Sequence, residues 1–248
     1  MRDMAFAVVT DLHLSDRTFP DSEKKLHRFM EHVNRNEDIE FTMFLGDYMC
    51  PESALDFKQM LGALKHPYHL LYGNNDVAQL SDLEDIFSPL NYKIEYEDTI
   101  ILGIWSCSPA TIESGAHHGH LSESEFAWIE NELVHSSSRK KIVATHVPPR
   151  VPNSTEDEVF RMDDSTSTRF LEMCSAQKVD IGLYGHIHHN EVFRYGPTVH
   201  VTTPSLAWNF NKSFGYKSRD WVKVDYGGYR VIHLGQTYCD DVIWLHGR

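Results

Sequence analysis

The sequence predicts an α/β fold in which two mixed parallel and antiparallel sheets, with helices outside them, form a single domain over residues 1–248. Three observations support this prediction. Short apolar runs alternate with helical patterns, hairpin patterns occur in the middle and near the end, and no linker or internal repeat divides the chain. Strands separated by helices imply βαβ units with parallel pairing, whereas hairpins add antiparallel pairs.

Five short apolar runs each end in polar residues that metals favour. The endings are Asp11 and His13 after Ala5–Thr10, Gly46-Asp47 after Phe41–Leu45, Gly73-Asn74 after Tyr68–Tyr72, His146 after Lys141–Thr145, and Gly185-His186-Ile187-His188 after Ile181–Tyr184. In an open α/β sheet, ligands bind beyond the carboxyl ends of the strands. The five endings therefore predict an oxygen-and-nitrogen metal site at one edge.

Apolar residues at helical spacing predict four helices between these strands. They are Leu26, Phe29, Met30 and Val33 with Ser22 as N-cap; Phe57, Met60, Leu61 and Leu64 with Ser53 near the start; Phe126, Ile129 and Leu133 after capping-box spacing at Ser122 and Glu125; and Phe170, Leu171 and Cys174 after Thr166.

Three hairpins and two long loops complete the predicted elements. The hairpins are Lys93–Tyr96 with Ile100–Trp105, Glu191–Tyr195 with Thr198–Thr202, and Trp221–Tyr226 with Tyr229–Leu234 across a Gly227-Gly228 turn. The loops are Ser106–Leu121, which carries His117, His118 and His120, and Val147–Asp164. Long loops within a compact domain are often functional.

The composition limits the class of function. The formal net charge is −13, so a basic groove for long nucleic acid is not expected, and the surplus of acidic residues is explained by solubility. Four scattered cysteines form neither a disulfide framework nor a thiolate zinc site. With no secretory signal and no apolar stretch of membrane-spanning length, we expect a cytoplasmic protein that does not enter a membrane.

Each polar strand ending has a structural explanation when taken alone. Asp11 could cap a helix, and Asp47 and Asn74 could belong to ordinary turns. However, alternate residues point the same way in an extended segment, so Asp11 with His13, and His186 with His188, could reach one ion. The two oxygens of a carboxylate such as Asp47 can bridge two cations.

In chain order, these motifs read Asp-x-His, Gly-Asp, Gly-Asn-x-Asp, His and Gly-His-x-His, and the set resembles the signature of the calcineurin-like metallophosphoesterase family. The resemblance implies a two-sheet α/β sandwich flanked by helices, with a dinuclear metal site. One ion would be held by Asp11, His13, Asp47 and His188, and the other by Asp47, Asn74, His146 and His186. Such mixed ligands suit manganese, iron or zinc.

The resemblance also implies the reaction. We expect hydrolysis of a small phosphomonoester or phosphodiester by a bridging metal-bound hydroxide, without a phospho-enzyme. The Gly-His-Ile-His and Thr203-Pro204-Ser205 stretches look like those of cyclic-nucleotide phosphodiesterases. The alternative is a weakly active metal-binding scaffold that binds a protein partner. The oligomeric state is not predicted.

The chain departs from the family pattern at Asn75, where the family usually has a histidine that assists the leaving group. An amide cannot give up a proton in the useful pH range. Either the leaving group is good enough without help, or another acid such as His117, His118 or His120 substitutes, or the site turns over poorly. The candidate catalytic residues are Asn75, Asp76, His117 and His118.

Three further residues have both functional and structural interpretations. Arg150 could contact a phosphate oxygen or be an ordinary surface residue. Trp208 and Phe210 could stack on a base or pack in the core.

Overall fold

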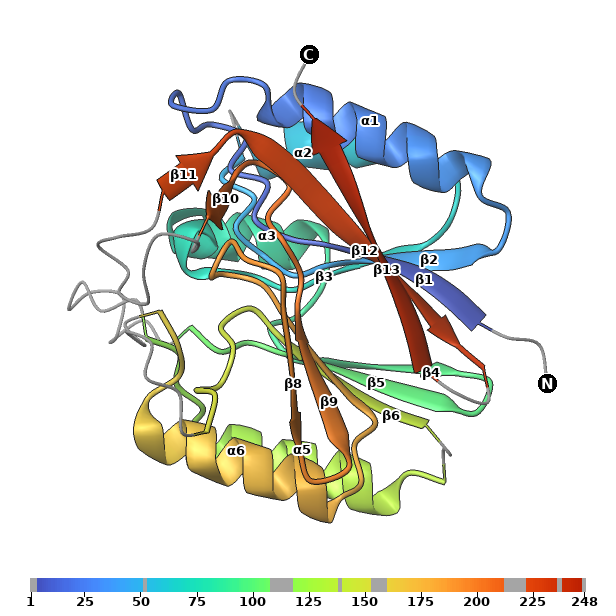
Figure 1. Ribbon diagram of the computed structural model, residues 1–248, viewed down its shortest axis with the longest axis vertical. Helices are drawn as coiled ribbons and strands as arrows, with labels where there is room; N and C mark the ends of the chain where they lie inside the picture. Colours follow the sequence, from blue (N-terminus) through green and yellow to red (C-terminus); the bar gives the residue numbers. More distant parts are fainter. Residues whose placement is uncertain are drawn as a thin grey trace.

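The computed structural model describes residues 4–50, 53–107, 118–137, 140–152, 160–211, 222–235 and 238–246. Two β-sheets lie against each other, and helices cover the outer side of each (Figure 1). The predicted two-sheet α/β architecture is confirmed.

The first sheet has the strand order β13-β12-β1-β2-β3. Strands β1, β2 and β3 are parallel, whereas β12 is antiparallel to β1 and to β13. The strands are β1 (Met4–Val9), β2 (Ile39–Phe44), β3 (Tyr68–Leu70), β12 (Tyr226–Leu234) and β13 (Tyr238–His246). The helices on this half of the fold are α1 (Ser22–Arg35), α2 (Ala54–Leu61), the 3₁₀ helix η1 (Asn74–Gln79) and α3 (Leu80–Ile86).

The second sheet has the order β4-β5-β6-β7-β9-β8, with parallel pairing from β5 to β9 and antiparallel pairs at both edges. Its strands are β4 (Tyr92–Tyr96), β5 (Thr99–Ile104), β6 (Lys140–Thr145), β7 (Ile181–Tyr184), β8 (Glu191–Tyr195) and β9 (Thr198–Thr202). Its helices are α5 (Glu123–His135) and α6 (Asp164–Ala176), and a small ribbon is formed by β10 (Asn209–Asn211) and β11 (Val222–Val224).

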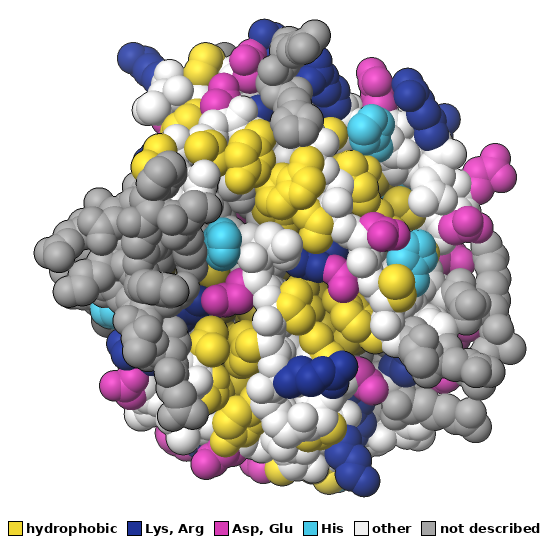
Figure 2. All heavy atoms as spheres, in the orientation of Figure 1, with side chains coloured by type: hydrophobic (Ala, Val, Ile, Leu, Met, Phe, Trp, Pro, Cys, Tyr) yellow, Lys and Arg dark blue, Asp and Glu magenta, His cyan; other side chains and the backbone are white. Residues whose placement is uncertain are grey.

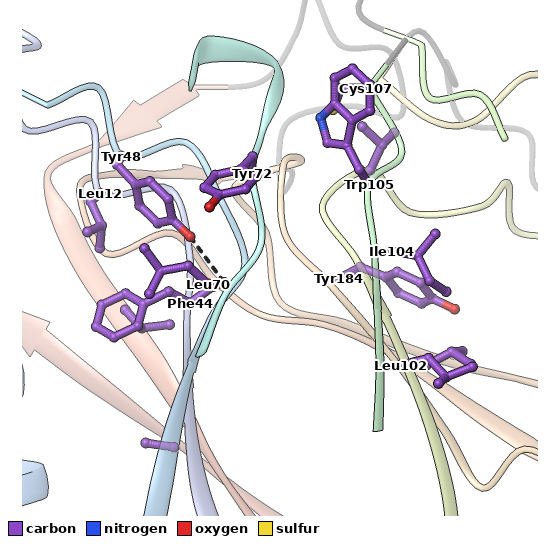
Figure 3. Packing of buried hydrophobic residues seen from close by; sticks show 14 of the residues in the cluster. Leu12, Phe44, Tyr48, Leu70, Tyr72, Leu102, Ile104, Trp105, Cys107 and Tyr184 are labelled. Atoms are coloured by element: carbon purple, nitrogen blue, oxygen red, sulfur yellow. Dashed lines mark hydrogen bonds between the residues drawn. The ribbon is translucent and has the colours of Figure 1, made fainter. Parts of the chain in front are cut away.

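Strand alternation divides the core into layers. Phe6 and Val8 of β1 face the apolar layer between the sheets, and Ala7 and Val9 face the layer under the helices. Figure 3 shows this second layer as two separate groups, with Phe44, Tyr48 and Tyr72 on one sheet and Leu102, Ile104 and Tyr184 on the other. Because both faces of each sheet are covered, most side chains of the central strands are apolar, and polar side chains gather mainly at the strand ends.

Two of the four predicted helix starts are confirmed and two are not. The helix predicted after Thr166 begins at Asp164, with Asp163 as its N-cap. Ser53 accepts a hydrogen bond from the backbone of Asp56, and Ser122 forms the predicted capping box with Glu125. Ser22 is instead the first residue of α1, and its hydroxyl donates to the carbonyl of Phe19. The Ser22 prediction is therefore wrong by one position.

The predicted Gly227-Gly228 turn is wrong. Both glycines lie inside β12, whose partner is β13, a strand that the sequence analysis did not predict. A Cβ on Gly227 would overlap the carbonyl oxygen of Leu206, and the backbone of Gly228 donates to the carbonyl of Ser205 at 2.9 Å. The glycines therefore allow the backbone of the 205–206 segment to lie close against the strand. Such close approach of another backbone is a common reason for glycine inside a strand.

The parallel strands bring the predicted metal ligands to one side of the molecule. In Figure 1, β1 and β2 of one sheet and β5 and β6 of the other all run toward the left, away from the N-terminus. None of the helices in the described ranges is long and apolar enough to cross a membrane.

Candidate metal centre

Six of the predicted ligands are buried where the two sheets meet. Asp11 and His13 follow β1, Asp47 follows β2, His146 follows β6, and His186 and His188 follow β7. All except His146 have positive φ, between 44° and 70°. Such dihedrals are uncommon for residues with a side chain, and they cluster at sites where geometry is imposed by function.

Asp11, His13 and His188 form the first cluster. The Nε2 of His188 lies 3.2 Å from Oδ1 of Asp11, and the Nε2 atoms of His13 and His188 are 3.0 Å apart. Three buried ligand atoms thus converge on one point from the ends of strands in different sheets.

Asp47, His146 and His186 form the second cluster. The Nε2 of His146 lies 3.3 Å from Oδ1 of Asp47, and the imidazole centroids of His146 and His186 are 5.0 Å apart. The other oxygen of Asp47, Oδ2, lies 3.7 Å from Nε2 of His13 in the first cluster. The carboxylate of Asp47 therefore stands between the clusters with one oxygen toward each, as a bridging ligand requires.

Backbone carbonyls fix the orientation of two imidazoles. The Nδ1 of His146 donates to the carbonyl of Leu45 at 2.6 Å, and the Nδ1 of His188 donates to the carbonyl of Trp208 at 2.9 Å. Because a carbonyl only accepts, Nδ1 carries a proton, and Nε2, which faces the cluster, is the nitrogen left to bind a metal ion. This arrangement is typical of histidines that ligate metals.

The cluster atoms fit metal ions. Two of them, Oδ1 of Asp11 and Nε2 of His146, are buried without a hydrogen-bond partner among the described residues, and so is Oδ1 of the predicted ligand Asn74. A buried polar atom normally has a partner, and each exception requires an explanation. Cations bound between the carboxylates and imidazoles would satisfy the Asp11 and His146 atoms, so the donor set suits two such ions.

The charges of the clusters depend on one another. Burial alone would raise the pKa of the Asp47 carboxyl, but His146 and His13 outweigh it and hold that pKa below its usual range. Conversely, burial alone would lower the pKa of His146, but Asp47 and Asp11 raise it to about 9. The two carboxylates thus favour positive charge on the imidazoles beside them.

A glycine is needed next to Asp47 for two reasons. Gly46 has φ of +102°, which a side chain disfavours, and a Cβ there would lie 2.5 Å from the backbone nitrogen of Gly73 and 2.8 Å from Nδ1 of His146. The Gly-Asp motif therefore lets three ligand-bearing loops approach one another.

Asn75 lies directly on the bridging carboxylate. Its backbone N–H donates to Oδ1 of Asp47 at 2.9 Å, and its side-chain Nδ2 donates to Oδ2 at 2.6 Å. The residue that departs from the family pattern is therefore at the centre, where a catalytic role remains a prediction.

Asp76 is fully buried under the same loop. Its two oxygens accept hydrogen bonds from the backbone N–H groups of Gly73, Asp47, Tyr48 and Met49. Burial, with the charge of Asp47, raises the pKa of Asp76 to about 6. These contacts favour a positioning role, and a catalytic role for Asp76 stays a prediction.

The histidines of the first long loop differ in what can be said of them. His117 lies outside the described residues. A ring nitrogen of His118 lies 3.2 Å from the carbonyl of Arg161, and the neighbouring Phe160 ring is 6.1 Å from the imidazole of His186. His120 instead contacts Asp163, the N-cap of α6, at 2.9 Å.

The other proposed substrate contacts have structural partners. Arg150 forms an ion pair with Asp164 at 3.0 Å. Trp208 is buried and packs on the imidazole of His188 at 3.8 Å between centroids. Phe210 packs edge-on against Trp208 at 4.9 Å and is only partly buried.

Sequence analysis missed two residues that support the centre. The hydroxyl of Ser205 donates to the carbonyl of Asp11 at 2.9 Å and accepts from the backbone of Ala207 at 3.1 Å. The ammonium of Lys25, only 1% exposed, donates to the carbonyl of Ala207 and to Asp225. The sequence did contain a signal for Lys25, because a lysine four residues before Phe29 lies on the apolar face of α1, where a charged residue needs a buried partner.

Comparisons with known proteins agree with this geometry. A probable cyclic nucleotide phosphodiesterase of Coxiella burnetii is 21% identical over 96% of this chain and 96% of its own length. Another of that description, from Vesicomyosocius okutanii, is 22% identical over 92% and 94%. A dimetal phosphatase from Danio rerio has the same fold, with a TM-score of 0.67, 12% identity and 98% coverage of both chains. GAP50, the anchor in the inner membrane complex of Plasmodium, superposes with a TM-score of 0.68 at 14% identity, covering 98% of this chain and 84% of that one.

The two-sheet fold and its paired buried clusters define a dinuclear metal-dependent phosphoester hydrolase that acts on small phosphate esters. The sequence model of the calcineurin-like phosphoesterases matches residues 4–190, and the chain belongs to that family.

Proposed function

We propose that the protein is a cyclic nucleotide phosphodiesterase with two ions of manganese, iron or zinc. The observation that carries the metal assignment is the Asp47 carboxylate, whose two oxygens face different clusters. The substrate assignment is supported by the two relatives described as probable cyclic nucleotide phosphodiesterases, which align with nearly the whole chain.

The ligand set proposed for the two ions contains the six clustered residues and Asn74. Asp11, His13 and His188 would hold one ion, His146, His186 and Asn74 the other, and Asp47 both. When bound, two such ions acidify a water molecule and stabilise negative charge on phosphoryl oxygens. The imidazoles of His146 and His188 are fixed through Nδ1 and need no further ordering to keep this geometry.

Beside the proposed ligands, Asn75 is the described residue with a side-chain hydrogen bond to Asp47. The Asn75 amide can donate a hydrogen bond beside Asp47 but cannot protonate an alkoxide. We propose His118 as a candidate for the missing acid, because the segment that it contacts also touches His186.

The proposal is tested by a substrate panel. Protein reconstituted separately with each of the three metals is assayed on cyclic nucleotides, linear phosphodiesters and phosphomonoesters. We expect the highest kcat/KM for a cyclic nucleotide. A clear preference for monoesters would contradict the substrate assignment and leave the metal assignment intact.

The scaffold hypothesis makes a different prediction for the same sample. A protein that has lost its chemistry would be expected to lose ligands, whereas all six clustered ligands are in place and oriented. Stoichiometric metal without turnover of any phosphoester in the panel would favour the scaffold.

Two broader assignments are also proposed. The first sheet joins β1 to the distant β12, which supports one domain over the whole chain. All four cysteines are free thiols, which supports a reducing compartment such as the cytoplasm.

A further inference from the structure

A cavity of about 570 Å³ opens beside the proposed metal centre. The amide side chains of Asn190, Asn209 and Asn211 line it together with the rings of Phe210, Tyr226 and Trp244. Its walls come from β10 and from the paired ends of β12 and β13, where Gly228 faces Trp244. In Figure 1, these strand ends gather beside β10, on the side toward which the ligand-bearing strands run.

The cavity is one residue away from the metal ligands. His189, which also lines it, directly follows His188. The backbone N–H of Phe210 donates to the carbonyl of His188 at 2.8 Å, and the two rings are 6.2 Å apart. A substrate held by its phosphate at the clusters would therefore have this cavity within reach of its remaining part.

The lining suits an uncharged, flat, hydrogen-bonding group. Among the described residues that line the cavity there is no Asp, Glu, Lys or Arg, although the whole chain has a net charge of −13. Apart from His189, the described lining offers no acidic or basic partner for a phosphate or a charged peptide. Aromatic rings interleaved with amides are instead the surroundings in which nucleobases bind.

Two of the amides have a defined orientation. Asn209 is fully used within the protein, because its oxygen accepts from the backbone of Ser205 and its Nδ2 donates to the carbonyls of Ser205 and Tyr226. The oxygen of Asn190 accepts from the buried Arg230 at 2.5 Å. Asn190 therefore offers its NH₂ group as a donor for a ring nitrogen or a carbonyl of the ligand.

The aromatic residues form a partly open surface. The rings of Tyr226 and Trp244 meet edge-on at 5.0 Å, and Trp244 is 38% exposed, which is high for a tryptophan. Figure 2 shows that hydrophobic side chains gather over the middle of this face, whereas most Lys, Arg, Asp and Glu residues stand toward its rim. The exposed part of Trp244 leaves an aromatic surface open at this cavity.

We propose that this cavity is the nucleoside subsite of the enzyme. The base stacks on Phe210, Asn190 donates a hydrogen bond to an acceptor on the base, and the pentose spans the distance to the phosphate at the metal centre. This inference rests on the proposed phosphodiesterase function, and it assigns nucleotide selectivity to residues that hold no metal.

The test compares a nucleotide substrate with one that has no nucleoside. Metal-loaded Phe210→Ala and Asn190→Ala are assayed on 3′,5′-cyclic AMP, 3′,5′-cyclic GMP and bis(p-nitrophenyl) phosphate. We expect the ratio of kcat/KM for the better cyclic nucleotide to that for the aryl diester to fall about tenfold in each variant. Phe87→Ala, in a separate cavity of about 400 Å³ at the β3 and β4 edges, is the matched control and should leave the ratio unchanged.

A binding measurement gives a second readout. Adenosine and guanosine, which lack phosphate, are titrated into the metal-loaded protein by calorimetry. We expect one of them to bind and its Kd to rise about tenfold in Phe210→Ala and in Asn190→Ala, and not in Phe87→Ala.

The outcomes separate the two proposals. If both substrate classes lose the same factor, Phe210 and Asn190 only support His188 and the subsite is overturned. If aryl esters are hydrolysed but neither nucleoside binds, the subsite is overturned and the hydrolase survives. If no phosphoester is hydrolysed, the proposed function fails, and nucleoside binding alone decides for or against the cavity.

Discussion

At the scale of single residues, the centre depends on Asp47 more than on any other ligand. It is the residue that contacts both clusters, through different oxygens, and its backbone N–H is held by Asp76 at 2.8 Å. Removing its charge takes away the carboxylate that lies beside both His13 and His146. An amide in its place can offer only one oxygen, so it cannot serve both ions.

Asp47→Asn should therefore weaken binding of both ions by more than the roughly 10–100-fold that loss of a supporting contact costs. Metal content after dialysis and the rate of phosphodiester hydrolysis measure this effect. The exposed Asp38→Asn is the control for a simple change in net charge. Retention of two ions per chain in Asp47→Asn would contradict the bridging role.

Asn75 makes a separate prediction about leaving groups. Its amide already lies 2.6 Å from the bridging carboxylate, so a histidine there would bring a titratable group to the centre. Asn75→His should raise hydrolysis of alkyl phosphoesters more than that of aryl ones, by up to about 10²–10⁴ if proton donation is what is missing. Asn75→Gln, which adds no proton donor of suitable pKa, is the control. Equal responses of the two substrate classes would show that Asn75 does not limit the leaving group.

The residues show what the sequence could and could not predict about the site. Asp11, Asp47, His146, His186 and His188 were predictable because each directly follows an apolar run, which is a local signal. The partners of their imidazoles were not, because the carbonyls of Leu45 and Trp208 belong to the backbone and leave no trace in the residue types. Ser205 was visible only as part of a motif, without its bond to Asp11.

At the scale of elements, α1 is tied to the centre through a single buried side chain. Lys25 donates to the carbonyl of Ala207, the backbone N–H of Ala207 donates to the carbonyl of Asp11 at 3.2 Å, and Trp208 follows next. The helix therefore holds the 205–208 turn against the metal ligands.

Lys25→Met should destabilise the protein by about 1.5–3 kcal/mol, the usual range for a lost hydrogen bond to a charged group. Chemical denaturation gives the free energy of unfolding. Lys24→Met is the matched control, because Lys24 is an exposed neighbour whose ion pair with Asp21 lies on the surface. If the two variants unfolded at the same denaturant concentration, the hydrogen bonds of Lys25 would contribute nothing to the stability of the fold.

In the second sheet, His200 of β9 gives a pH dependence that is independent of the metals. It stacks on Phe193 at 4.7 Å, one of its ring nitrogens lies 2.7 Å from the Tyr184 hydroxyl, and burial lowers its pKa to about 4. Between about pH 6.5 and 4, the unfolded chain binds a proton at this residue that the folded chain does not, so folding stability falls as the pH falls.

This contribution amounts to about 3 kcal/mol at most, since one pKa unit is about 1.4 kcal/mol. His200→Phe should remove it, so that the free energy of unfolding falls less steeply below pH 6.5 than in the parent protein. His27→Phe, at an exposed position on α1, should follow the parent curve. Parallel curves for the parent and His200→Phe would mean that His200 does not stay neutral in the fold.

The elements also show where local patterns mislead. The hairpins of β4 with β5 and of β8 with β9 were predictable, because strand alternation and a short turn lie within a few residues. Gly227 and Gly228 have the same local pattern as a turn, and only the approach of the 204–206 segment explains them. Strand β13 was not predicted for a similar reason: it is a strand because it pairs with β12, and that pairing is not visible in the local sequence.

At the scale of the whole molecule, the proposed metal ligands come from both sheets. Asp11, His13 and Asp47 follow strands of the first sheet, whereas His146, His186 and His188 follow strands of the second. Each cluster combines ligands from both, so each ion would join the two halves of the sandwich. Metal binding should then stabilise the fold as a whole, since an unfolded chain does not assemble either cluster.

Thermal unfolding with and without metal tests this coupling. An ion present at 100 times its Kd adds about 2.7 kcal/mol of stability, and for a chain of this length each kcal/mol raises the Tm by about 2–4 °C. The metal-loaded protein should therefore melt at least about 5 °C above the chelator-treated protein. Asp47→Asn should lose most of that increment, while Asp38→Asn should keep it. Two tightly bound ions with an unchanged Tm would mean that they bind without joining the sheets, and the placement of each cluster across both sheets would be wrong.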